Sequence, residues 1–334
     1  MFISASDPRL TYCGAVSIQS NENWTRLWRA PWDKLDLFPN DMLLQLSRPV
    51  GAKVRFSTNA VNIKLIPTPL SGNAKLDLVI DDEIIETVEA DMACTEIEFS
   101  PLSEGTKTIE IWFSQCVPVS LCGIEIDDNA TLEKSEDKRP KWITYGSSIT
   151  ECGAAASPAA TWPGIVARSR GLNLTSLGFG GQCHGDPMIL KMIRDMPADI
   201  ISMCLGINIH GRGSMGRRTF RPMVIGAIMT IREKHPDTPL VICSPIYCPY
   251  REESGNGPDG LSLQEMREEI SEAVNICQKR GDKKLFYING LDLFDVELAE
   301  YLPDNLHPNA DGYRILGENF LREVFELSGV GKLV

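Results

Sequence analysis

The sequence lacks a long apolar segment, an excess of positive charge and the leader of a secreted protein. No apolar run in its 334 residues is long enough to span a bilayer. The first residues, Met1 to Pro8, include neither a basic region nor the long apolar region of a signal peptide. The formal net charge of −12 disfavours nucleic acid or an anionic membrane as a partner, because both attract clustered Lys and Arg. We therefore expect a cytoplasmic protein that acts on a neutral or weakly charged small molecule.

Paired cysteine motifs are also missing. The ten cysteines are irregularly spaced, and no Cys-x-x-Cys pair occurs among them. Several lie in apolar runs such as Met203-Cys-Leu205, where a reduced cysteine behaves as a small hydrophobic residue. Cys183-His184, even with Cys152 and Cys248, lacks the paired spacing of a zinc site. We expect free thiols, no metal and no cofactor.

Residues 1–127 have the pattern of an all-β domain. Short runs with alternating or β-branched character are interrupted by Gly, Pro, Asn and Asp, and no long helical pattern separates them. This pattern predicts a β-sandwich of jelly-roll type. The clearest strand candidates are residues 53–57, 61–66, 75–80, 96–99 and 107–113.

Residues 128–140 are charged, have few apolar anchors and end in Pro140, so we expect a linker there. From residue 141 to 334, apolar strand-like runs alternate with amphipathic helical patterns, such as the one over residues 263–280. This alternation predicts an α/β domain in which helices cover both faces of a parallel sheet. The expected strands are residues 142–145, 172–176, 200–205, 240–244 and 285–288.

Polar and glycine-rich clusters follow the first three of these strands. They are Gly146-Ser-Ser-Ile149, Gly178-Phe-Gly-Gly-Gln182 and Gly206-Ile-Asn-Ile209. A fourth cluster, Asp304-Asn-Leu-His307, precedes the last helical pattern, and Pro308 disfavours a helical conformation at His307. Because ligands of open parallel sheets bind beyond the carboxyl ends of the strands, we expect the four clusters to converge.

The residue types in these clusters fit acyl transfer through serine. Ser148 can act as the nucleophile, His307 as the base that takes its proton, and Asp304 as the carboxylate that orients the histidine. The reaction also needs donors aimed at the oxyanion of the tetrahedral intermediate. The backbone N–H groups of Ser148 and Gly181 and the side-chain amide of Asn208 can provide them.

The four clusters resemble the conserved blocks of the SGNH, or GDSL, hydrolase superfamily. Ser148, Gly181 and Asn208 match the Ser, Gly and Asn of its first three blocks, and Asp304 and His307 match its Asp-x-x-His. The resemblance covers about the C-terminal three-fifths of the chain and implies a three-layer αβα, flavodoxin-like domain. Two aspartates that are usual in the family are replaced by Ser147 and Ile209, and neither is a catalytic or oxyanion residue.

The resemblance extends to bacterial two-domain members with an N-terminal β-sandwich, which include esterases and acyltransferase-like enzymes of natural-product pathways. It implies a serine esterase that cleaves an O-acyl ester of a small molecule or carbohydrate through an acyl-enzyme. The alternatives are acyl transfer to a natural-product or sugar hydroxyl, and a non-catalytic carbohydrate-binding protein. No Gly-x-Ser-x-Gly sequence occurs, which excludes the nucleophile elbow of the α/β-hydrolases.

Other polar residues near these clusters have two interpretations that the sequence leaves open. His184 and His210 lie close to the expected oxyanion donors, so they are candidates to bind substrate as well as candidates for packing. The cationic stretch from Arg212 to Arg221 either begins a solvated helix or contacts a substrate carboxylate. The Gly211–Gly216 segment matches Gly-x-Gly-x-x-Gly, but its place after the third strand disfavours a phosphate site.

Overall fold

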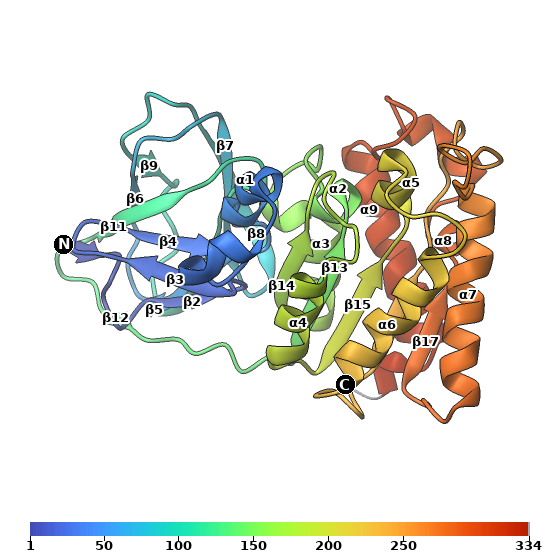
Figure 1. The fold of residues 1–334 in the computed structure, drawn as a ribbon. Helices are drawn as coiled ribbons and strands as arrows, with labels where there is room; N and C mark the ends of the chain where they lie inside the picture. The colour runs from blue at the N-terminus through green and yellow to red at the C-terminus, as the bar shows by residue number, and fades with distance from the viewer. Residues whose placement is uncertain (333–334) are drawn as a thin grey trace. The chain divides into compact units, whose positions relative to one another are not determined.

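The computed structural model describes residues 1–332, and the chain separates into two compact units (Figure 1). The first unit contains Met1–Arg139 together with two short later segments, Ala156–Ala160 and Ala167–Ser176. The second contains Pro140–Ala155, Thr161–Val166 and the chain from Leu177 onward.

The first unit is built from two antiparallel sheets. One has the order β3-β4-β11-β6-β9, with β1 beside β11, and the other has the order β12-β5-β10-β7-β8, with β2 beside β5. The strands of the first sheet are β1 (Phe2–Ser4), β3 (Ser17–Ser20), β4 (Thr25–Trp28), β6 (Ile63–Pro67), β9 (Ile97–Glu98) and β11 (Ser120–Ile126). Those of the second are β2 (Thr11–Cys13), β5 (Lys53–Thr58), β7 (Ala74–Ile80), β8 (Glu83–Ala90), β10 (Lys107–Trp112) and β12 (Leu132–Glu133).

Side chains from both sheets form one apolar core. Leu65 and Ile124 enter it from the first sheet, and Phe56 and Ile109 enter it from the second; each is at most 1% exposed. In β6 the buried residues alternate with more exposed neighbours, which is the period-two pattern of a strand with one buried face. The β-sandwich predicted for this half of the chain is therefore confirmed.

The segment over 128–140, which we expected to be a linker, is partly ordered against the second sheet. β12 pairs with β5, and Leu132 is 7% exposed. Arg139 forms ion pairs with Asp137, Glu110 and Asp82. Arg139 and Asp137, two of the charged residues that indicated a linker, thus form ion pairs.

A buried carboxylate in the first unit explains why residues 156–160 belong to it. Asp77 of β7 is fully buried and accepts hydrogen bonds from the Ser157 hydroxyl and the Ala159 backbone N–H, both at 2.6 Å, and from the Thr87 hydroxyl. These three donors satisfy a charge that would otherwise be costly to bury.

Residues 141–288 contain a five-stranded sheet in the order β14-β13-β15-β16-β17. The pairs β13–β15, β15–β16 and β16–β17 are parallel. The observed bounds agree with the predicted strands to within two residues. They are β13 (Lys141–Gly146), β14 (Asn173–Gly178), β15 (Ile200–Cys204), β16 (Leu240–Cys243) and β17 (Leu285–Ile288).

Helices follow the strands as the alternation predicted. The α-helices are α1 (Leu43–Ser47), α2 (Ser148–Glu151), α3 (Trp162–Arg170), α4 (Pro187–Asp195), α5 (Ile207–Arg212), α6 (Phe220–Arg232), α7 (Leu263–Lys279), α8 (Gly290–Leu293) and α9 (Ala310–Phe320). The 3₁₀ helices are η1 (Trp32–Leu37), η2 (Asn40–Met42), η3 (Pro158–Ala160), η4 (Val296–Tyr301) and η6 (Val330–Lys332), and a π-helix, η5 (Leu321–Leu327), follows α9.

The helices of the second unit pack through apolar contacts. α4, α6 and α7 form one row, in which α6 contacts both neighbours. Elsewhere Phe320 of α9 packs on Trp162 and on Trp142 of β13, with ring centroids 4.8 and 5.6 Å apart. The parallel sheet with its helices confirms the predicted α/β fold. No helix among residues 1–332 is both long and apolar enough to cross a membrane.

All ten cysteines are free thiols, and six of them are buried. Burial raises the pKa of the Cys152 and Cys183 thiols well above the ordinary value, because a thiolate would lose its hydration there. The thiol form is therefore the stable one at both positions, which makes them poor nucleophiles.

We expect iodoacetamide at pH 8 to modify the folded protein only at the partly exposed cysteines, Cys94, Cys116, Cys122 and Cys204. The buried thiols should react only after unfolding in guanidinium chloride, when all ten become accessible. Peptide mapping by mass spectrometry measures the modified positions. Rapid modification of Cys183 in the folded protein would contradict the expectation.

Candidate active site

The turn after β13 presents Ser148 at the start of a one-turn helix. Ser147 has an extended backbone, and its hydroxyl accepts a hydrogen bond from the Ile149 N–H at 3.2 Å, so it caps α2. Cys152 caps the C-terminus of α2, and its φ of 61° is left-handed. A Cβ at Gly146 would lie 2.1 Å from the Thr150 hydroxyl, so only glycine fits where the strand turns into the helix.

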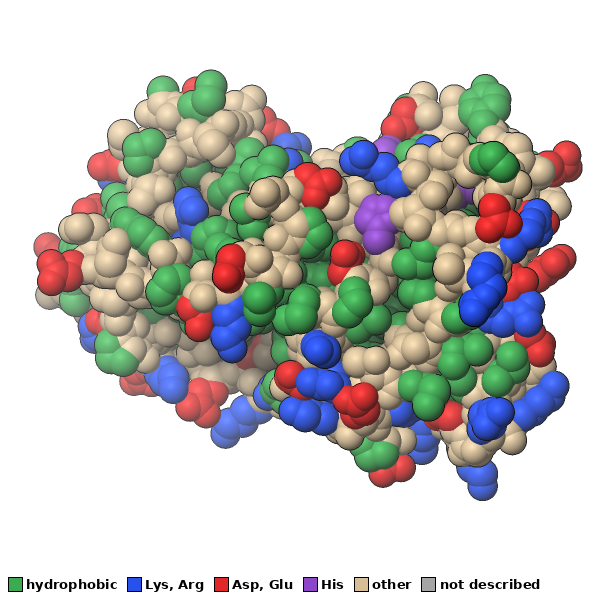
Figure 2. Space-filling view, in the orientation of Figure 1, with side chains coloured by type: hydrophobic (Ala, Val, Ile, Leu, Met, Phe, Trp, Pro, Cys, Tyr) green, Lys and Arg blue, Asp and Glu red, His purple; other side chains and the backbone are tan. Residues whose placement is uncertain are grey.

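Ser148, His307 and Asp304 form a continuous hydrogen-bonded chain. The Ser148 Oγ lies 2.8 Å from Nε2 of His307, and Nδ1 of the same ring lies 2.6 Å from Oδ2 of Asp304. The side chains of His307 and Asp304 are 34% and 54% exposed. Histidine side chains are visible at the surface of the second unit, where acidic and basic groups are interleaved (Figure 2). A histidine in this position can take the proton of an attacking serine.

Asp304 is held in its ionised form. Partial burial alone would raise its pKa, but hydrogen bonds from the backbone N–H and the ring of His307, and from the backbone N–H of Leu306, lower the pKa below the ordinary value. A carboxylate that accepts from Nδ1–H leaves Nε2 of His307 as the acceptor that faces Ser148.

The loop after β14 leaves one backbone N–H available. Among the residues that the structure describes, every backbone N–H from 179 to 185 donates to a partner except that of Gly181. The acceptors are Gly146 O for Phe179, Glu151 Oε2 for Gly180, Phe179 O for Gln182, Asn208 Oδ1 for Cys183, Gln182 O for His184 and the Tyr145 hydroxyl for Gly185. Gly181 has a φ of +71°, and a Cβ placed on it would meet no atom within 4 Å. Its N–H therefore belongs to a glycine that borders open space.

Two further donors have no partner within the described part of the chain. One is the backbone N–H of Ser148, which lies in the first turn of α2. The other is the side-chain amide of Asn208, whose Oδ1 accepts from the Cys183 N–H at 3.0 Å and whose Nδ2 is left over. Together with Gly181, the structure leaves unpaired the same three donors that the sequence analysis selected.

The two candidate substrate-binding histidines have protein partners. His184 lies between the carbonyl oxygen of Gly181 (3.1 Å from Nε2) and the hydroxyl of Ser214 (2.8 Å from Nδ1). His210 is buried, and its Nε2 donates to the carbonyl oxygen of Ser254 at 2.8 Å. Burial lowers the pKa of His210, which favours the neutral ring. His184 thus supports the Gly181 loop, and His210 fixes the loop around Ser254.

The cationic stretch and the glycine motif also have structural explanations. Arg217 and Arg221 form ion pairs with Glu265 and Glu269 of α7, both at 2.5 Å. A Cβ at Gly216 would lie 2.2 Å from a carboxylate oxygen of Asp259, and such a charge disfavours a phosphate at this motif. No group of three or more His, Cys, Asp or Glu side chains within residues 1–332 is arranged to hold a metal ion.

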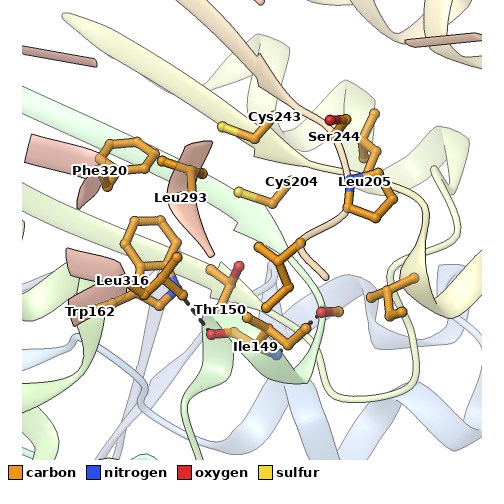
Figure 3. Close-up of a pocket in the computed structure, with 14 residues that line it drawn as sticks. Ile149, Thr150, Trp162, Cys204, Leu205, Cys243, Ser244, Leu293, Leu316 and Phe320 are labelled. Atoms are coloured by element: carbon orange, nitrogen blue, oxygen red, sulfur yellow. Dashed lines mark hydrogen bonds between the residues drawn. The ribbon is translucent and has the colours of Figure 1, made fainter. Parts of the chain in front are cut away.

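A small cavity lies beneath the nucleophile turn, on its interior side (Figure 3). Its volume is about 30 Å³, and its lining is almost entirely apolar, with Trp162, Leu316 and Phe320 among the walls. The indole N–H of Trp162 donates to the Ile149 carbonyl at 2.9 Å and ties the turn to this wall. The volume suits one or two water molecules.

Sequence reasoning did not select Glu151, the last residue of α2. Its side chain is 4% exposed, and Oε2 accepts the Gly180 N–H at 2.6 Å. An acidic residue three positions after the nucleophile, on a helix of one turn, is the only signal for it in the sequence.

Sequence profiles match both halves of the chain. The profile of the GDSL-like lipase/acylhydrolase family matches residues 139–323, and the profile of the SsfX3 N-terminal domain matches residues 10–119. A search of curated proteins found no match.

Solved structures resemble the chain over nearly its whole length. The salicylyl-acyltransferase SsfX3 from a tetracycline biosynthetic pathway is 33% identical, with a TM-score of 0.88 over 97% of this chain and 96% of that one. A putative GDSL-like lipase from Bacteroides ovatus is 21% identical, with a TM-score of 0.75 over 99% and 98%. A family two carbohydrate esterase from Clostridium thermocellum is 14% identical, with a TM-score of 0.69 over 96% and 98%. The chain belongs to the GDSL-like lipase/acylhydrolase family.

Proposed function

We propose that this protein is a serine esterase that cleaves an O-acyl ester of a small molecule or carbohydrate through an acyl-enzyme. The observation that carries the proposal is the hydrogen-bonded chain from Ser148 through His307 to Asp304. It supplies a nucleophile, a base within reach of the proton, and a carboxylate that selects the tautomer of the base.

In the first half of the reaction, Ser148 Oγ attacks the ester carbonyl carbon while its proton passes to Nε2 of His307. The carbonyl oxygen becomes an oxyanion, which the three unpaired donors of Ser148, Gly181 and Asn208 would stabilise. The bond from the carbonyl carbon to the alkoxy oxygen then breaks. His307 returns the proton to that oxygen, so an alcohol leaves and the acyl group stays on Ser148.

In the second half, a water molecule attacks the acyl-enzyme and gives its proton to His307. The second tetrahedral intermediate expels Ser148 Oγ, which takes the proton back, and the carboxylic acid leaves. This scheme uses only protein groups and returns every atom of the site to its starting state.

A hydroxyl compound can replace water in the second half, which turns the same site into an acyltransferase. One observation favours this second candidate: the relative with 33% identity over 97% of the chain is named as a salicylyl-acyltransferase. The other neighbours at 14–21% identity support the fold alone. A purely carbohydrate-binding function is disfavoured because all five expected residues are present and because hydrogen bonds join Ser148, His307 and Asp304.

The nucleophile can be tested against an adjacent serine. We expect Ser148→Ala to abolish turnover of short-acyl nitrophenyl esters, because no other group in the hydrogen-bonded chain can form the acyl-enzyme. The matched control is Ser147→Ala, which removes the cap of α2 at a cost of about 1 kcal/mol in stability but keeps the nucleophile. Initial rates over a range of acyl lengths measure both variants. Absence of any Ser148-dependent turnover would refute the enzyme proposal.

The roles of the other two residues predict different losses. His307→Ala removes the base and should lower kcat by about 10⁴-fold or more. Asp304→Asn keeps the shape of the side chain but favours the wrong tautomer of the His307 ring, so kcat should fall by about 10³- to 10⁴-fold. Steady-state kinetics with the same esters give both values. Near-normal kcat in Asp304→Asn would mean that another acceptor, such as a backbone carbonyl, orients the ring.

Hydrolysis and transfer are separated by the products. The donor is an acetyl or aryl ester, and the concentration of a hydroxyl acceptor is raised. For an esterase, the fraction of turnovers that produce free acid should stay unchanged. A transferase should convert most of the released acyl group into the new ester. Chromatography measures the acid and the new ester, and their amounts relative to the released nitrophenol give the fraction of acyl groups that goes to water or to the acceptor. Phenolic and sugar hydroxyls are the two acceptor classes to compare. Dominant transfer to either acceptor would replace the esterase proposal with the acyltransferase.

A further inference from the structure

Glu151 connects the nucleophile helix to the loop that carries Gly181. It is the last residue of α2, which begins at Ser148, and its side chain is 4% exposed. Oε2 accepts the backbone N–H of Gly180 at 2.6 Å, which is a short hydrogen bond. One helix of four residues thus carries the nucleophile at one end and an anchor for the neighbouring loop at the other.

The loop is also in direct backbone contact with α2. A Cβ at Gly178 would lie 2.2 Å from the backbone nitrogen of Glu151, so the two segments approach as closely as backbones can. The Phe179 N–H donates to the Gly146 carbonyl at 2.8 Å, just before the nucleophile turn. The entry to the loop is therefore fixed on the same turn that fixes Ser148.

The next two residues, Gly180 and Gly181, have the widest backbone freedom of any residue pair. The hydrogen bond to Glu151 fixes the peptide group that ends in the Gly180 N–H, and the following peptide group presents the Gly181 N–H. On the C-terminal side of the diglycine, the ring of His184 contacts the Gly181 carbonyl oxygen. The side-chain oxygen of Asn208 accepts the Cys183 N–H. Without the carboxylate, the Gly180 N–H would lose its acceptor, and the diglycine would be held only by the backbone bonds of Phe179 and Gln182 and by the contacts on its C-terminal side.

We infer that Glu151 is a positioning residue that sets the direction of the Gly181 N–H toward the oxyanion. That Glu151 orders the loop follows from its hydrogen bond to Gly180. That it affects the reaction rate rests on the proposed function. Because a donor acts on the transition state more than on the bound ester, the effect falls on kcat and not on KM.

The test compares Glu151→Ala with Glu151→Gln, whose amide oxygen can accept the same N–H. Each is assayed with an oxoester and with the matching thionoester, whose sulfur is a weak hydrogen-bond acceptor and gains little from the oxyanion donors. Glu151→Ala should lower kcat for the oxoester by about 10- to 100-fold, with KM changed less than about threefold. The thionoester rate should fall much less, and Glu151→Gln should recover most of the oxoester rate. Asn208→Ala removes one proposed oxyanion donor outright. Its loss of oxoester rate relative to thionoester rate is the reference against which the Glu151 variants are compared.

Hydrogen exchange of the peptide that covers residues 178–184 measures the positioning without any substrate. Exchange should be at least about tenfold faster in Glu151→Ala than in wild type and in Glu151→Gln. Unchanged exchange would overturn the positioning role. Faster exchange with equal losses for both esters would overturn the catalytic consequence, since a general defect does not distinguish oxygen from sulfur. Absence of Ser148-dependent turnover refutes the proposed function instead, and exchange still decides whether Glu151 orders the loop.

Discussion

The parallel register between β13 and β15 is the constraint on which the rest of the site depends. Tyr145 pairs with Met203, so the chain leaves both strands at the same level of the sheet. The turn that carries Ser148 and the turn that carries Asn208 then emerge side by side, at one carboxyl-end edge. Apolar side chains on buried strands set that register, because a slip of one residue would turn every side chain to the opposite face. The turns that carry Ser148 and Asn208 are thus positioned by the packing of apolar strand residues, none of which is proposed to take part in the reaction.

Much of the fold followed from the sequence because the signals were local. The strands of the sheet were apolar runs bounded by glycine or polar residues, and they were found to within two residues. Ser148, Gly181 and Asn208 were recognisable as candidate site residues because each followed a strand, and a parallel sheet brings such positions to one edge. Asp304 and His307 were recognisable because only two residues separate them.

The interactions that escaped sequence analysis join segments distant in the chain. The bond from Glu151 to Gly180 spans 29 positions, and the one from Asp77 to Ser157 spans 80. Neither hydrogen bond has a recognisable sequence pattern, because the tertiary structure alone brings each buried carboxylate to its donors. The same reason applies to residues 128–140, where high charge indicated solvent but Arg139 has three carboxylate partners. Charge counts alone do not distinguish a hydrated segment from an ion-paired one.

The two departures from the usual family pattern have simple local explanations. Ser147 caps α2 through its hydroxyl, a task that serine and aspartate perform about equally well. Ile209 is fully buried on α5, where an ionised side chain would lose its hydration without compensation. Neither change alters Ser148, Gly181 or Asn208, the residues proposed as nucleophile and oxyanion donors.

The partial exposure of the His307–Asp304 pair bears on the lifetime of an acyl-enzyme. With 34% of the histidine and 54% of the aspartate side chain exposed, solvent borders both side chains. A competing acceptor would gain access to the acyl carbon only by covering this imidazole and displacing the water beside it. Selectivity between the two nucleophiles would then be a property of how well the acceptor seals the site, and not of the reacting groups themselves.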